Sequence, residues 1–555
     1  MESTSHKKRI LQRWEELKNE RASWLAHWKE ISDHLLPRSG RFFVEDRNKG
    51  EKRHNNIYDS TGTKSLGTLT AGMMAGNTSP ARPWFRLTTS VPELDESPAV
   101  KIWLSDTTRL MQMVFAKSNT YRALHTMYEE LGAFGTAASI VLPDFDNVIH
   151  HYPLTAGEYC IATDYRGVVD TIYREFQMTV GQIVEQFGKD KCTLSVQQAY
   201  ERGALGQWVT VLHAIEPRRN RDTTKRDSMN MPWKSVYLEK GGEEGKVLRE
   251  SGFRRFPALC PRWDVKGGDI YGASPAMTAL GDIKQLQHEQ LRKAQAIDYK
   301  TKPPLQYPSS MKNQVSNTLP GGISYVDQNS PTGGIRTAYE VNLDLSHLLN
   351  DIQDVRQRIQ GSFYADLFLM MANGTNSAMT ATEVAERHEE KMLMLGPVVE
   401  RFGNEGLEPL IEMTFDYMLE AGIVPPPPEE MQGMELSVEF VSMLAQAQRA
   451  IATNSVDRYI GNMGALAQLK PEVLDRLNAD HWADAYGDML GIDPELIVSQ
   501  KDADALRQAR AQAAQQAAQQ EQMAMAAETA SKLGGINTEQ PSALSDVTRA
   551  FSGYT

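Results

Sequence analysis

Cysteine is scarce in this 555-residue chain, which holds only three. Cys160, Cys192 and Cys260 stand far apart and form no CxxC pair, so we expect free thiols in a reducing compartment and no zinc site. No apolar run approaches the length of a membrane-spanning helix, and the N-terminus lacks the apolar core of a secretion signal. The sequence therefore predicts no membrane partner and no secretion.

Motifs that carry catalysis are also missing. The nearest approach to a phosphate-binding loop, residues 241–247, has the wrong spacing, two acidic residues and Val247 in place of the metal-binding hydroxyl. GxGxxG, GxSxG, HExxH and EF-hand patterns do not occur. His150 and His151 are neighbours on an expected strand and face opposite ways, so they cannot hold one ion together. We predict no enzymatic activity, cofactor or metal, although a site assembled from distant residues leaves no such motif.

Positive charge is in deficit, because the formal net charge is −12. Tight binding over a wide nucleic-acid surface needs clustered Lys and Arg, so an acidic chain is a poor candidate for it. The charge suits a surface past which DNA slides, and it also fits an ordinary acidic soluble protein, which is the commoner case. The length exceeds what one hydrophobic core usually supports, so we expect several packed units.

The features that are present are organised around residues 271–422, which predict two long helices, an excursion between them and a third helix. Ser274 and Pro275 are typical of a helix start, and Pro303 ends the first helix. The second helix has an apolar seam at steps of three and four, which suits packing against one neighbour. The seam residues are Leu345, Leu348, Ile352, Val355, Ile359, Phe363 and Leu367. The opposite face carries Asp351, Asp354, Arg356 and Arg358.

The connections around these helices are rich in turn residues. Residues 302–343 hold several Pro and Gly around short strand-like runs such as 323–326, which predicts a small α+β module. Residues 369–377 are a loop by composition, and Thr380 with Glu383 forms a capping box that begins the third helix. We expect kinks in that helix at its glycines and prolines. These are Gly396-Pro397, Gly403, Gly406 and Pro409.

The N-terminal half alternates helix-rich and strand-rich parts. Helices are expected over residues 7–36, 61–76, 98–117, 120–134 and 179–187, and strands over 84–87, 140–142, 148–152, 159–162, 168–176, 235–238 and 252–257. The first helix, with Trp14, Trp24 and Trp28, docks either onto a partner or, as we favour, into its own chain. Asp144 and Asp146 fit a hairpin turn better than a metal site.

Beyond residue 424 the pattern turns helical. Residues 436–500 predict short helices, and residues 502–533 are rich in Ala, Gln and Glu with almost no large apolar side chain. Such a helix is marginal alone, so it either packs against copies of itself or frays. Residues 534–555 are expected to be loosely ordered.

Five short segments together carry a resemblance to a known family. They are IYDST (57–61) ahead of a small-residue helix, WFRL (84–87), DYRGVVDTIYREF (164–176), RW (262–263) and YGASPAM (271–277). With them, residues 8–500 resemble the head-to-tail connector, or portal, proteins of short-tailed double-stranded DNA bacteriophages. The order of helix, module, helix, loop and helix agrees independently with that family.

The resemblance implies an α+β, mainly helical subunit of a ring, typically twelvefold, at one capsid vertex. Double-stranded DNA would be packaged and ejected through the ring without its sequence being read. The implied parts are a wing at 1–270 with a long kinked helix at 380–424, stem helices at 271–301 and 344–368, a clip at 302–343, a tunnel loop at 369–379, a crown at 425–501 and an extension at 502–555, as a barrel or a loose tail.

The resemblance also gives expected roles to particular side chains. In the tunnel loop, Asn373, Gly374, Thr375 and Asn376 either touch sliding DNA or form a plain helix connection. The charges of the stem either face DNA or, as we favour, form salt bridges between copies. These are Lys284, Arg292, Lys293, Asp351, Asp354, Arg356 and Arg358. The packing of the stem falls to Leu348, Ile352, Val355, Ile359 and Phe363.

The partners implied are further copies of the chain, double-stranded DNA, the major capsid and scaffolding proteins, the terminase motor and the tail adaptors. The implied location is a virion vertex, with the host cytoplasm during assembly. Two other classes stay open. One is an oligomeric virion adaptor or scaffold without a DNA channel. The other is a DNA-processing enzyme, which needs a nucleotide or metal site that the sequence does not display.

Overall fold

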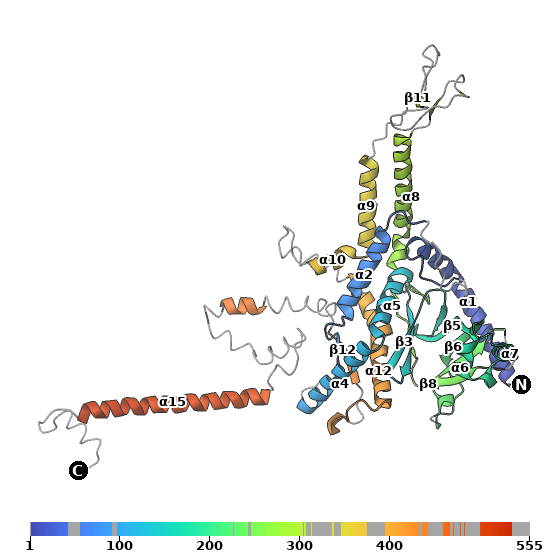
Figure 1. Ribbon diagram of the computed structural model, residues 1–555. Coiled ribbons are helices and arrows are strands. Elements are labelled where there is room, and N and C mark those ends of the chain that lie inside the picture. The colour runs from blue at the N-terminus through green and yellow to red at the C-terminus, as the bar shows by residue number, and fades with distance from the viewer. Residues whose placement is uncertain are drawn as a thin grey trace. The chain divides into compact units, whose positions relative to one another are not determined.

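The computed structural model describes residues 2–42, 56–91, 97–225, 227–241, 246–302, 305–306, 312, 336–337, 346–373, 394–431, 436–441, 459–466, 470, 478, 482 and 500–534. The chain divides into two compact units, Met1–Ala452 and Thr453–Thr555. The first unit combines helices with antiparallel sheets, which is the α+β class that the sequence predicted (Figure 1). The cysteines are free and buried.

Four helices build much of the core of the first unit. They are α1 (Glu2–His34), α2 (Thr61–Asn77), α4 (Pro98–Lys117) and α5 (Thr120–Phe134). The sequence predicted α4 and α5 with these bounds. Pro98 stands in the first turn of α4, and Gly135 caps α5 in the left-handed conformation with φ of 75°. Glycine also lets α2 pack closely on α5, because a Cβ on Gly132 would lie 2.8 Å from Leu66.

The largest sheet has five antiparallel strands in the order β4-β5-β6-β7-β8. They are β4 (Tyr159–Thr163), β5 (Val169–Thr179), β6 (Trp208–Pro217), β7 (Trp233–Glu239) and β8 (Arg249–Phe253). Alternate residues point to opposite faces, so Leu212 packs with α1 whereas Val211 packs with α6 (Val180–Phe187) and α7 (Leu194–Glu201). Trp14 of α1 stacks on Tyr173, which confirms that the first helix docks into its own chain. The sequence analysis missed β6 and α7.

Two smaller sheets complete the body. Strands β2 (Ala138–Asp144), β3 (Val148–Leu154) and β9 (Ala258–Leu259) form one in the order β3-β2-β9. The other sheet pairs β1 (Phe85–Thr89) with β12 (Leu436–Phe440). Of these two strands, we expected β12 to be helical. That prediction was wrong because β12 is stabilised by a partner about 350 positions earlier in the chain, with Phe85 opposite Phe440.

A pair of long helices, α8 (Pro275–Thr301) and α9 (Ser346–Ser362), lies side by side in Figure 1. Ser274 caps α8 by accepting a hydrogen bond from the Met277 amide, as its sequence predicted. The pair is antiparallel, because Asp282 near the start of α8 meets Arg358 near the end of α9. A short strand, β10 (Leu305–Gln306), follows α8, and another, β11 (Arg336–Thr337), precedes α9. The two strands pair with each other. The strand-like run at 323–326 lies outside the described residues.

The second helix of this pair ends earlier than the sequence predicted. Tyr364 has φ of 54°, so α9 ends at Ser362 and a new helix, α10 (Ala365–Asn373), begins just after it. Residues 369–373 are therefore helical, where we expected a loop. The Tyr364 ring packs 6.3 Å from that of Trp263, and such tertiary contact compensates a backbone conformation that local sequence disfavours.

The third helix is irregular, as its glycines predicted. Residues 394–402 are helical, a π-helical turn follows at Gly403–Leu407, and α12 (Glu408–Glu420) continues the chain. The capping box at Thr380 and Glu383 lies outside the described residues. In the second unit, α15 (Gln500–Gly534) is a 35-residue helix over the Ala/Gln-rich segment.

Candidate functional site

The apolar seam between α8 and α9 is built from the residues that the sequence singled out. Ile352, Val355, Ile359 and Phe363 are fully buried, whereas Leu348, nearer the start of α9, is half-buried. From α8, Ile283 and Leu286 belong to the same core. The side chains of the seam therefore become more fully buried from the start of α9 toward its end.

One buried carboxylate, that of Asp59, joins this helix pair to the start of α2. It accepts hydrogen bonds from the Thr61 amide at 2.8 Å, from Gln290 Nε2 of α8 at 3.0 Å and from Arg356 Nη2 of α9 at 2.7 Å. Burial raises the pKa of Asp59, but the hydrogen bonds from Thr61 and Arg356 outweigh this effect and hold the pKa below its usual value. In the sequence, Asp59 stood out only as part of the IYDST segment ahead of a small-residue helix.

Gln287 of α8 completes this junction. Its side-chain oxygen accepts from the backbone amides of Tyr58 and Asp59, and its Nε2 donates to the Asp59 carbonyl at 2.9 Å. Gln287 is itself buried. Gln287 of α8 thus satisfies the backbone that leads into α2, while Arg356 of α9 binds the Asp59 side chain, and together they fix the helix pair to the body.

The charged residues predicted for the stem form contacts within one chain. Lys284 pairs with Glu30 at 2.6 Å, and Arg358 lies 3.5 Å from Asp282 and 3.6 Å from Asp354. Arg356 pairs with Asp59, as described above. These contacts form because α1, Asp59 and the opposite helix of the pair lie within reach. That the stem charges also bridge copies of the chain stays a prediction.

The remaining residues that were predicted for the stem and the tunnel loop show fewer contacts with other elements. Arg292 donates to His288 and Gln295 of its own helix, and Lys293 is half-buried. Asp351 lies beside Glu289, a buried residue that the sequence analysis missed. Burial, together with the nearby Asp351 carboxylate, raises the pKa of Glu289. Asn373 is the last residue of α10, and Gly374, Thr375 and Asn376 lie outside the described residues.

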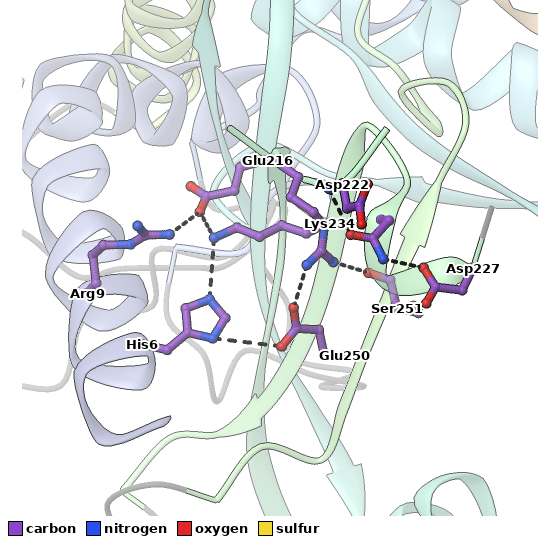
Figure 2. A network of polar contacts seen from close by, with 10 residues as sticks. His6, Arg9, Glu216, Asp222, Asp227, Lys234, Glu250 and Ser251 are labelled. Carbon is purple, nitrogen blue, oxygen red and sulfur yellow. Dashed lines mark hydrogen bonds and ion pairs between the residues drawn. The ribbon is translucent and has the colours of Figure 1, made fainter. Parts of the chain in front are cut away.

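A separate polar network, drawn in Figure 2, holds the start of α1 against the five-stranded sheet. Glu216 accepts from Arg9 at 3.5 Å and pairs with Lys234, while His6 lies 3.8 Å from Glu250. Burial raises the pKa of Glu216, but Lys234, Tyr173 and Arg9 together outweigh burial, so the pKa lies below its usual value. Arg9 of α1 and Lys234 of β7 both pair with the Glu216 carboxylate of β6, so this network attaches α1 to the sheet.

The described part of the chain contains no group of three or more His, Cys, Asp or Glu side chains that could hold a metal ion. None of the helices searched within it is long and apolar enough to span a membrane. Burial raises the pKa of Cys160 and of Cys192 to about 11, so neither thiol is activated as a nucleophile.

Comparisons with known proteins identify the family. Residues 7–498 match the model of the bacteriophage head to tail connecting protein family. A probable portal protein of Bordetella phage BPP-1 is 69% identical over the whole of both chains, and the portal protein of Salmonella phage epsilon15 is 45% identical over 98% of each. The chain therefore belongs to the family of bacteriophage head-to-tail connecting proteins, the portal proteins of the virion.

Solved structures of low sequence identity are also similar in part. The neck of an empty gene transfer agent particle has a chain that is 11% identical, with a TM-score of 0.35. The match covers 73% of this chain and 86% of that one. A chain in the neck of the native particle, computed with C12 symmetry, is 13% identical with a TM-score of 0.33 and covers 75% and 91% of the two chains.

Proposed function

We propose that copies of this chain form a closed twelvefold ring at one capsid vertex, through which double-stranded DNA is packaged and later ejected. The observation that carries the proposal is full-length similarity to two phage portal proteins, at 69% and 45% identity. The ring would bind the packaging motor while the head fills and the tail adaptors afterwards. Capsid and scaffolding proteins would surround it during assembly.

In this assignment the α8–α9 pair is the stem, the residues between the two helices are the clip, and the body up to residue 270 with α12 is the wing. The junction at Asp59 supports a stem that moves together with the wing, because Thr61, Gln290 and Arg356 all bind one carboxylate. A net charge of −12 per chain supports a channel that DNA passes without prolonged binding. The residues from Asn373 to Asn376 would face that DNA.

Cryo-electron microscopy of the purified full-length protein tests the proposal. A closed ring with an axial hole wide enough for a DNA duplex is the expected result. A defined assembly without a through-pore would instead favour the virion adaptor or scaffold. Metal-dependent cleavage or unwinding of DNA by the purified ring would show that the protein also processes DNA.

The stem assignment has its own test in Phe363→Asp. This change places an unpaired charge in the buried end of the α8–α9 seam and should cost about 3 kcal/mol or more, with loss of rings in electron micrographs. Leu349→Asp is the matched control, because Leu349 is exposed on α9, the helix that Phe363 directly follows. Normal rings from the Phe363 variant would show that this face does not pack the stem.

A further inference from the structure

The turn between β4 and β5, Asp164 to Val168, presents an aromatic side chain to solvent. Tyr165 is 95% exposed and Val168 is 54% exposed. A single exposed apolar side chain is ordinary in a soluble protein and carries no argument by itself. The way in which this turn is held is the informative feature.

The turn is fixed first by its own residues. The Asp164 carboxylate accepts hydrogen bonds from the amides of Arg166 at 2.8 Å and Val168 at 3.0 Å, and it pairs with the Arg166 side chain at 3.0 Å. Gly167 has φ of 81°, which suits glycine and strains other residues. The Arg166 guanidinium also lies 5.6 Å from the centre of the Tyr165 ring.

The buried side chain of Arg262, from a distant part of the chain, also holds the turn in place. Arg262, 4% exposed, donates through Nη2 to the Gly167 carbonyl at 2.8 Å and through Nη1 to the Ile270 carbonyl at 3.3 Å. Glu405, in the π-helical turn, fixes this guanidinium by accepting from its Nε at 3.1 Å and its Nη2 at 2.6 Å. Glu405 also accepts from the Arg262 amide at 3.0 Å.

We propose that this braced turn, the Tyr165 finger (residues 164–168), is a contact between neighbouring copies of the chain, an inference that rests on the proposed ring. A Tyr beside an Arg is the composition typical of residues that dominate interface energies, and a turn whose backbone is already fixed loses little entropy on binding. In a ring the contact is heterologous, so the finger of each copy meets a different surface of the next copy.

Charge favours a second copy over DNA as the occupant. Each chain carries a net charge of −12, so two copies repel one another unless their contact surfaces are uncharged or paired. The finger meets this condition because Asp164 and the exposed Arg166 neutralise each other, and Tyr165 and Val168 are the exposed groups without charge. A DNA contact would need net positive charge, which the finger lacks.

Site-specific photo-crosslinking tests the finger directly. A photoreactive amino acid at position 165 of the full-length chain should give a covalent dimer, and mass spectrometry should locate the second end on another copy of the chain. The same amino acid at position 145 is the control, because Phe145 is also fully exposed at a hairpin turn. Crosslinks from position 165 to a different virion protein in assembled particles, with none between copies, would overturn the inference.

A matched pair of substitutions measures how much the finger contributes. Tyr165→Ser should raise the protein concentration at which rings form by about tenfold in sedimentation velocity, whereas Phe145→Ser should leave it within twofold of wild type. Equal effects, or none, would exclude a specific role for Tyr165. A wild-type chain that forms no ring even in particles would refute the proposed function, whereas wild-type rings unaffected by Tyr165→Ser refute only this inference.

Discussion

Two hairpin turns of the body share one sequence pattern and differ in how they are held. The β2–β3 turn reads Asp144-Phe145-Asp146-Asn147-Val148, and the β4–β5 turn reads DYRGV over residues 164–168. Each begins with Asp, continues with a fully exposed aromatic residue and has Val at its fifth position. In both turns the first Asp accepts hydrogen bonds from later residues of the same turn.

The difference lies in backbone strain and in contacts from outside the turn. The β4–β5 turn places Gly167 at φ of 81° and is braced by Arg262, whereas the β2–β3 turn places a β-branched residue, Val148, at φ of 70°. In the β2–β3 turn, Asn147 donates from its amide and from its side chain to Asp144 of the same turn. A shared local pattern thus makes two hairpins, and distant residues decide which of them becomes rigid.

The two hairpins meet at a third element, the segment from Thr155 to Glu158. The Glu130 carboxyl of α5 accepts from the Thr155 hydroxyl at 2.7 Å and from the Ala156 amide at 3.0 Å. Glu130 is buried, and burial raises its pKa to about 8, with the nearby Glu129 and Glu158 carboxylates adding to the effect. The junction of the hairpins therefore contains a carboxyl group that is partly protonated near neutral pH.

Removing the brace should have the largest effect. Arg262→Ala leaves Glu405 without its cation and should cost about 3 kcal/mol of unfolding free energy in urea titrations. Hydrogen exchange should quicken at residues 164–168 and remain unchanged at 144–148. Arg254→Ala is the control, since Arg254 is 65% exposed and 3.8 Å from Glu420, and it should cost less than about 0.5 kcal/mol. Equal exchange in both turns would contradict the comparison.

The carboxyl group at the junction should make stability depend on pH. Because its pKa is about 8 in the folded chain and near 4.5 when unfolded, the folded state binds the extra proton between these values. Its contribution is therefore full below pH 4.5 and is lost as the pH rises to about 8.

Glu130→Gln should flatten this dependence and, at a pH above 8, be more stable than wild type by about 2 kcal/mol. Unfolding in urea across pH 5 to 9 measures the difference. Glu129→Gln removes the same charge from the neighbouring, half-buried position and should leave most of the dependence in place. Parallel curves for wild type and Glu130→Gln would show that this carboxyl does not titrate at the junction.

The sequence was sufficient where structure is set by neighbours in the chain. The bounds of α4 and α5, and strands at the positions of both hairpins, followed from apolar spacing and turn residues. The pairing of β1 with β12, the brace between Arg262 and Glu405 and the convergence on Asp59 did not follow, because each joins residues more than 100 positions apart. For Glu405, the nearby Gly403 and Gly406 predicted irregularity but not its ion pair.

Adding a side chain to the glycine of the braced turn should have a smaller effect. Gly167→Ala meets no atom within 4 Å, but its positive φ should still cost about 1 kcal/mol. Gly206→Ala is the matched control: its Cβ also meets no atom within 4 Å and its φ is not in the left-handed region, so stability should not fall. Urea unfolding separates the two, and an equal loss in both would contradict a role for φ.

The strained valine of the other turn should give the smallest effect, with the opposite sign. Val148→Asn relieves a β-branched residue from the left-handed region, which Asn tolerates, but it also loses partly buried apolar contact. We expect a net gain of about 0.5 kcal/mol in urea unfolding. Val168→Asn changes the fifth position of the braced turn, where φ is not positive, and should bring no gain. If Val148→Asn destabilised the protein by as much as Gly167→Ala, the apolar contact of Val148 would outweigh its strain, and the unbraced hairpin would be held by packing after all.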